Sequence, residues 1–176
     1  MKFSQMLLAA SLLLAPFAHA QTAIQSASTP ETCGPSTTLD ELITSLDAAV
    51  SGPADKDRTC MRDLLLPDAR LTPMAKAPEG GLAPHILTVD GWIGAVQKRG
   101  HAAIYEKQVK VRQEVYSNIA HLWSTYELRL NSPEAKPEVR GINSIQAVYD
   151  GKRWRVYGIL WQAETPTTPI PDKYLP

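Results

Sequence analysis

The pair Asp150-Gly151 constrains the fold more than any other feature, because it separates two runs that alternate between apolar and polar residues. Such a pair between alternating runs is the strongest short-range signal for a β-hairpin. The alternation continues upstream, so that strands are expected over residues 104–116, 117–130, 138–149 and 153–163. The second half of the chain therefore predicts an antiparallel meander of at least four strands.

In the first half of the chain, the apolar residues are spaced as they are in helices. Apolar side chains recur at intervals of three and four residues from Leu39 to Val50, and Thr38 and Glu41 are spaced as in a capping box. Further helices are expected over residues 57–66 and 88–99, with an extended segment over 68–74 between them. Helices followed by strands predict an α+β domain, with three N-terminal helices packed on one face of the sheet.

Both ends of the chain read as segments outside this domain, which we place at residues 38–164. Residues 1–20 have the pattern of a secretory signal peptide, with Lys2, an apolar run and a small-residue cleavage site between Ala20 and Gln21. That run is too short to cross a hydrocarbon core of about 30 Å. Residues 21–37 read as a polar linker and residues 165–176 as a Pro-rich tail. The expected location is therefore periplasmic or secreted.

The two cysteines and the charge balance limit the chemistry. Cys33 and Cys60 are expected to form a disulfide in an exported protein, the alternative being two buried thiols. The chain has 18 basic and 18 acidic residues, which gives no reason to expect nucleic acid or an anionic membrane as a partner. No histidine pair has metal-ligand spacing, and no cofactor-binding motif is present. We therefore expect neither a metal nor a cofactor.

The predicted hairpin also assigns side chains to the two faces of the sheet. A two-residue turn at Asp150-Gly151 places Tyr149 opposite Lys152, so that one face is small and apolar and should meet the helices. The other face is aromatic and charged, and it carries Trp123, Arg140, Gln146, Tyr157 and Trp161. Large aromatic side chains on an open sheet face indicate a partner surface, which we interpret as a dimer face.

The chain resembles the nuclear transport factor 2-like superfamily, which includes the SnoaL-like cyclases. The resemblance covers residues 39–164 and rests on the order of elements and on the ending Tyr149-Asp150-Gly151-Lys152-Arg153-Trp154. Stretches such as residues 140–146 and 161–164 are also similar to exported bacterial members of unassigned role. The resemblance implies a curved sheet closed by helices into a cone with a pocket at its wide end. It also implies a homodimer through the open sheet face.

The pocket residues follow from the predicted faces. Tyr105, Tyr126, Asn143 and Asn118 are expected to point into the cone, and His85 to lie near its mouth. An Asn on an apolar face must be hydrogen-bonded, so Asn143 either binds a ligand or is bonded within the protein. His85 is either an acid–base group or a solvated loop residue.

Three functions remain open at this point. Glu106 falls on the outward phase, so no carboxylate is expected inside the cone, and this counts against an isomerase, dehydratase or cyclase. A domain that binds a small apolar ligand is favoured, and a dimerisation scaffold with no ligand is the third alternative. Catalytic residues are not assigned. A perturbed titratable group inside the cavity, such as Glu106 or His85, would restore the enzyme hypothesis.

Overall fold

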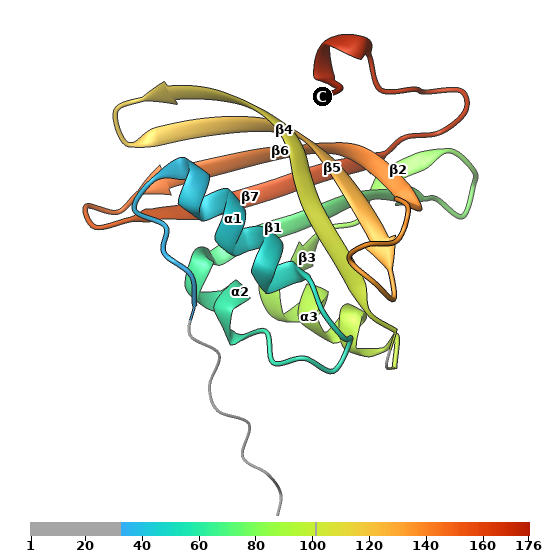
Figure 1. Ribbon diagram of the computed structural model, residues 1–176, viewed down its shortest axis with the longest axis horizontal. Coiled ribbons are helices and arrows are strands. Elements are labelled where there is room, and N and C mark those ends of the chain that lie inside the picture. The colour runs from blue at the N-terminus through green and yellow to red at the C-terminus, as the bar shows by residue number, and fades with distance from the viewer. Residues whose placement is uncertain (1–32, 101) are drawn as a thin grey trace, which may run out of the picture.

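The computed structural model describes residues 33–100 and 102–176 and has the expected α+β architecture (Figure 1). Its helices are α1 (Leu39–Val50), α2 (Thr59–Leu64) and α3 (Val89–Gln97), with a final 3-10 turn η1 (Asp172–Tyr174). Its strands are β1 (Leu65–Lys76), β2 (Leu82–Pro84), β3 (Leu87–Thr88), β4 (Ile104–Tyr116), β5 (Ile119–Leu130), β6 (Val139–Tyr149) and β7 (Trp154–Ala163). The signal peptide and most of the linker predicted from the sequence lie outside the described residues.

The capping box predicted at the start of α1 is present. The Thr38 hydroxyl accepts a hydrogen bond from the backbone of Glu41 at 3.2 Å, and the Glu41 carboxylate accepts one from the backbone of Thr38 at 3.0 Å. Both bonds satisfy amide groups that the first turn of a helix leaves unpaired. The apolar side of α1 then enters the core through Leu42, Leu46 and Ala49.

The sheet has seven strands in the order β2-β1-β7-β6-β5-β4, with β3 paired to β1. Strands β4 to β7 form the predicted antiparallel meander, and β1 joins it parallel to β7. The helices lie on one side of this curved sheet and the C-terminal segment lies on the other (Figure 1). We call these the helix face and the outer face. None of the helices in the described residues is long and apolar enough to cross a membrane.

The β6–β7 turn differs from the prediction. Tyr149 pairs with Trp154 rather than with Lys152, so the loop has four residues. The Asp150 carboxylate accepts hydrogen bonds from the backbones of Lys152 at 2.9 Å and Arg153 at 3.0 Å, which stabilises the longer loop. A shift of two residues keeps each side chain on its predicted face, so Ala147 and Val156 remain in the core.

Two β-bulges reverse the faces farther along the strands. In β7, Val156 pairs with Ala147 but Gly158 pairs with Gln146, so Tyr157 is an additional residue. The predictions for the residues beyond it are therefore wrong: Leu160 lies on the outer face, and Trp161 lies on the helix face. In β4, Gln108 pairs with Tyr126 and Lys110 with Thr125, which makes Val109 the additional residue.

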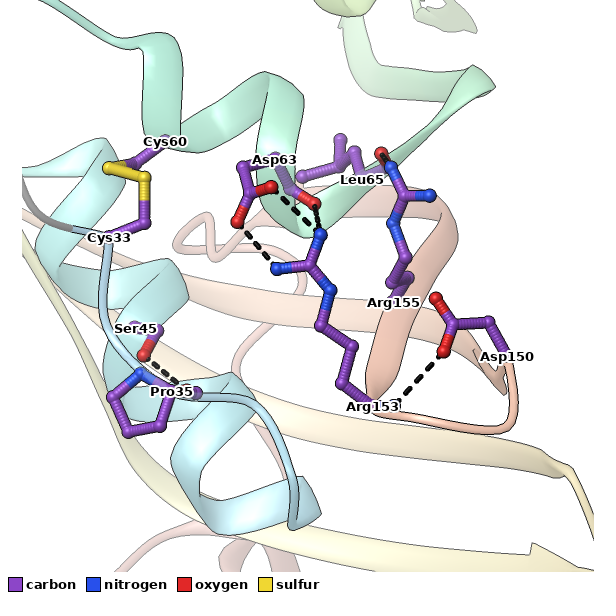
Figure 2. A network of polar contacts seen from close by, with 9 residues as sticks. All are labelled: Cys33, Pro35, Ser45, Cys60, Asp63, Leu65, Asp150, Arg153 and Arg155. Carbon is purple, nitrogen blue, oxygen red and sulfur yellow. Dashed lines mark hydrogen bonds and ion pairs between the residues drawn. A yellow bond between two sulfur atoms is a disulfide. The ribbon is translucent and has the colours of Figure 1, made fainter.

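Helix α2 and the first residue of β1, Leu65, are fastened to the rest of the domain at three points (Figure 2). The predicted disulfide between Cys33 and Cys60 is confirmed and joins α2 to the segment before α1. The Arg153 guanidinium binds both carboxylate oxygens of Asp63, at 2.6 and 2.8 Å. Arg155 donates to the backbone carbonyl of Leu65 at 2.6 Å. These contacts hold the base of the cone.

Candidate functional site

A pocket opens on the helix face of the sheet, at the end of the cone where α1, α3 and β4 meet. Its volume is about 90 Å³. Three of its lining residues are polar or charged, namely Glu106, Asn143 and Arg99. Its other walls are apolar and come from Leu46, Val50, Met61, Leu71, Trp92, Ile104, Leu128, Ile159 and Trp161.

The bulge at Val109 is the reason that Glu106 enters this pocket. Glu106 pairs with Leu128 on the helix face, and the neighbouring Tyr105 pairs with Arg129 on the outer face. The prediction that Tyr105 points inward and that no carboxylate does is therefore wrong. Regular alternation, counted back from Val111, places Tyr105 on the helix face and Glu106 on the outer face. The count fails because Val109 is an additional residue that breaks the alternation.

The end of α1 holds β4 in place at this point. The Ser51 hydroxyl donates to the backbone carbonyl of Glu106 at 3.3 Å and accepts from its amide at 3.0 Å. The Asp47 carboxylate accepts from the backbone amide of Gln108 at 2.9 Å. β4 is the last strand in the sheet order, and these bonds give its outward-facing backbone groups at Glu106 and Gln108 their hydrogen-bond partners.

Glu106 belongs to a network of polar side chains that are buried or half-buried. Its Oε1 atom accepts from Asn143 Nδ2 at 3.2 Å and from Gln108 Nε2 at 2.9 Å. Gln108 Nε2 also donates to Asp47 Oδ1 at 3.2 Å. The side-chain oxygen of Gln108, Oε1, accepts hydrogen bonds from Ser124 Oγ at 2.5 Å and from Asn143 Nδ2 at 3.1 Å. These two bonds fix the orientation of the Gln108 side-chain amide.

This network leaves two acceptor atoms without a partner among the described residues. Both amide donors bind Oε1 of Glu106, so its Oε2 atom accepts no hydrogen bond from them. Asn143 uses its amide nitrogen for both of its bonds, and its Oδ1 atom receives none. Since both residues line the pocket, these two oxygens can accept hydrogen bonds from a ligand, and Arg99, which also lines the pocket, can donate one.

Burial changes the protonation of the network. Burial, together with the nearby Asp47 carboxylate, raises the pKa of Glu106 to about 7, although its bonds to Asn143 and Gln108 act in the opposite direction. Burial raises the pKa of Asp47 to about 6. Burial and the Glu106 carboxylate also raise the pKa of Tyr126, so its phenol stays protonated. A carboxyl group with a pKa near neutrality can both donate and accept a proton.

Of the five pocket residues predicted from the sequence, Asn143 lines the pocket, and Tyr126 lies on the helix face without lining it. Tyr126 is buried beside Gly141, where an added Cβ would come within 2.5 Å of the Tyr126 hydroxyl. Tyr105 lies on the outer face. Asn118 is exposed in the β4–β5 turn, and His85 is exposed in the loop between β2 and β3. Neither of them lines the pocket.

Sequence reasoning placed Glu106 on the wrong face and did not single out Gln108 or Asp47. Asp47 did carry a signal, because it lies four residues after Ile43 on the apolar side of α1, where a carboxylate needs a partner. Gln108 carried no such signal, because the face of the sheet on which it lies depends on the bulge at Val109. Within the described part of the chain, no three His, Cys, Asp or Glu side chains are grouped so that they could hold a metal ion.

The predicted dimer face is divided by the C-terminal segment. Tyr174 packs against Trp123, with ring centroids 5.8 Å apart, and its carbonyl accepts from the Thr125 hydroxyl at 2.5 Å. Gln146 and Tyr157 remain exposed on the outer face, whereas Arg140 binds Glu164 at 2.9 Å. Dimerisation stays a prediction, and the outer-face area open to it is smaller than the sequence indicated.

Fold and pocket together define a small cone-shaped α+β domain with a carboxylate at the pocket wall. No protein-family model matches the sequence, and no curated protein matches it. Solved structures do match, and they show that the chain has the nuclear transport factor 2-like fold predicted from its sequence. At identities of 11–15% they establish the fold alone.

Three of these structures illustrate the similarity. A protein from Kribbella flavida shares 15% identity and a TM-score of 0.54 over 72% of this chain and 88% of its own. A nuclear transport factor 2-like protein of unknown function from Shewanella baltica shares 11% identity and a TM-score of 0.51, over 72% and 91%. A nuclear transport factor 2-like protein from Cytophaga hutchinsonii shares 14% identity and a TM-score of 0.50, over 72% of this chain and 92% of its own.

Proposed function

We propose that the cone pocket binds a small molecule and that Glu106 transfers a proton to or from it. The observation that carries this proposal is the Glu106 carboxyl, which lines the pocket with its Oε2 atom free of the surrounding amides and has a pKa raised to about 7. A carboxyl group in this state is suited to general acid–base catalysis near neutral pH. Isomerisation, dehydration and cyclisation all need such a group.

The pocket limits the substrate by size and polarity. A volume of about 90 Å³ is well below the roughly 300–1,000 Å³ of drug-sized sites, so the reacting part of the substrate must be small. Its walls favour an apolar body. Asn143 Oδ1 can accept a hydrogen bond from a substrate hydroxyl, while Glu106 Oε2 exchanges the proton. Arg99, the other polar residue of the lining, can donate a hydrogen bond to a substrate carbonyl, so small ketones and hydroxyketones fit this description.

The test is a deuterium-exchange assay that does not require the natural substrate. A panel of small ketones and hydroxyketones is incubated in D₂O with the wild-type protein, and loss of the α-proton signals is followed by NMR. We expect accelerated exchange for at least one compound, and Glu106→Gln should slow it about 100-fold or more. Glu114→Gln is the matched control, since Glu114 is exposed on the same strand.

A second candidate function is binding without turnover, which the predominantly apolar lining of the pocket favours. The same experiment separates the two. Compounds that shift amide resonances of the pocket residues but exchange no protons would identify a binding protein. Equal exchange rates in the wild type and in Glu106→Gln would contradict the role of Glu106.

We also infer that the protein works outside the cytoplasm, after cleavage between Ala20 and Gln21. The disulfide between Cys33 and Cys60 supports this location, because such bonds persist in oxidising compartments. Expression in a bacterium followed by mass measurement of the periplasmic fraction tests it. A chain that starts at Gln21 is expected there, and a full-length cytoplasmic product would contradict the inference.

A further inference from the structure

A second cavity lies on the outer face of the sheet, away from the cone pocket. It has a volume of about 380 Å³, which is within the range of small-molecule sites. Its floor is formed by side chains of β1, β5, β6 and β7, including Met74, Trp123, Ile142 and Leu160. Residues 168–171 of the C-terminal segment form its other wall, and this segment crosses the sheet opposite the helices (Figure 1).

The C-terminal segment is anchored at both ends of this wall. Near its start, the side chain of Ile170 is buried, and its amide donates to Glu164 Oε1 at 3.0 Å. Near its end, Tyr174 packs on Trp123, and the Leu175 carbonyl accepts a hydrogen bond from Lys110 Nζ. The cavity is therefore bounded by a segment whose position over the sheet is held by specific contacts.

The lining residues indicate which molecules would bind. Most are apolar, none is basic, and Glu164 is the one acidic residue among them. The Glu164 carboxylate is already paired, through Oε2 with Arg140 and through Oε1 with the amide of Ile170. The lining offers no cation that could pair with an anionic ligand, so it favours a neutral one.

One donor at this site is unpaired. The indole nitrogen of Trp123 is buried and has no hydrogen-bond partner among the described residues. Buried donors normally have a partner, so an unpaired one calls for an explanation. A ligand oxygen placed at this nitrogen would supply the missing acceptor.

We propose that the outer cavity is a second binding site, for a neutral and predominantly apolar molecule that carries an oxygen acceptor. The C-terminal segment covers the bound molecule, and Trp123 provides the aromatic wall. The two cavities open on opposite faces of the sheet and have Trp161 in common, but the proposal does not rely on the function proposed for Glu106.

The test uses 1-octanol and octanoate, which have the same chain and differ in charge. Each is titrated into the ¹⁵N-labelled protein comprising residues 21–176, and amide shifts are followed by NMR. We expect saturable shifts at Ile142 and Ile170 with 1-octanol, and a Kd for octanoate that is about tenfold or more higher. The amides of Glu106 and Asn143 should be unaffected.

Two substitutions on β7 localise the binding. Leu160→Glu places a charge on the cavity floor at a side chain that is 46% exposed, and it should raise the Kd of 1-octanol about tenfold. Tyr157→Glu is the matched control, because Tyr157 is exposed on the same strand and does not line the cavity, and its Kd should change less than about twofold. Urea unfolding of both variants shows whether each is folded.

Four outcomes of the binding experiments would overturn the proposal. These are no saturable shift with 1-octanol, equal affinity for octanoate, a folded Leu160→Glu variant that binds as the wild type does, and shifts confined to the cone pocket. A stable dimer in sedimentation that protects Leu160 from solvent would also overturn it, because a second copy would then cover the cavity.

Discussion

Gln108 fixes the position of Glu106, since its Nε2 atom donates to Glu106 Oε1 at 2.9 Å and its own carbonyl is held by Ser124 and Asn143. The same amide donates to Asp47, so two half-buried carboxyl groups share one donor group. Close carboxyl groups that are poorly hydrated resist being charged together. The protonation of this pair should therefore affect both chemistry and stability.

The first prediction concerns stability and pH. The pKa of Glu106 rises from an ordinary value of 4.5 to about 7 on folding, and that of Asp47 from 3.8 to about 6. The folded state thus binds more protons, so this contribution to stability is present below about pH 4 and is lost as the pH rises to about 7. Urea unfolding between pH 4 and pH 8 should show stability falling across this window.

Glu106→Gln should remove much of that dependence. The Gln carbonyl can take the place of Oε1 between Asn143 and Gln108, and no charge remains to be buried. We expect the variant to be more stable than the wild type by about 2 kcal/mol at pH 8, with a smaller difference at pH 4. Glu114→Gln controls for removal of an exposed charge. A difference that is constant over this pH range would contradict the assignment.

The second prediction concerns Gly141, which lies under the ring of Tyr126. An added Cβ would lie 2.4 Å from the Gln162 carbonyl and 2.5 Å from the Tyr126 hydroxyl, closer than atoms can approach. Gly141→Ala should therefore lower the free energy of unfolding by about 1–3 kcal/mol. Chemical denaturation measures the effect.

Gly94→Ala is the control for this substitution. Gly94 lies inside α3 and has open space around its missing side chain. Alanine favours helix over glycine, so this variant should be more stable by about 0.5–1 kcal/mol. If both variants changed stability in the same direction, the close contact at Gly141 would not be the cause.

The sequence predicted the fold well and the site in part, for reasons that these residues make clear. The capping box at Thr38 and the alternation in the strands are local patterns, and they located α1 and the meander. The bulges at Val109 and Tyr157 leave no mark on the alternation, yet each reverses the face of every residue beyond it. That is why Glu106 was assigned outward and Trp161 to the outer face. The return of Tyr174 onto Trp123 depends on contacts between residues far apart in the chain, which local patterns do not predict.

The third prediction compares two ion pairs of arginine. Arg153 binds both oxygens of Asp63 and also its backbone carbonyl, at the β6–β7 turn (Figure 2). Arg62 makes a single hydrogen bond to Asp90, and both partners are at least half exposed. Arg153→Gln should cost about 1 kcal/mol, and Arg62→Gln less than about 0.5 kcal/mol.

Thermal unfolding at low and high salt checks the comparison. The cost of Arg153→Gln should shrink only slightly at high salt, because the pair is partly buried and the bonds have fixed geometry. Equal costs for the two substitutions would show that the contact with Asp63 contributes no more than an ordinary surface pair.

The last prediction concerns the disulfide between Cys33 and Cys60, which closes a loop over a sequence separation of 27 residues. Removing the bond frees this loop in the unfolded chain, and the expected loss of stability is about 3.5 kcal/mol. Urea unfolding with and without reductant measures this loss. The variant with both Cys33→Ser and Cys60→Ser is the control, and reductant should not change its midpoint.

Because α2 is also held by Arg153 and Arg155, the reduced protein should still fold, with the Glu106 pocket intact. Loss of the pocket resonances on reduction would show instead that the disulfide is required to position the helices over the sheet.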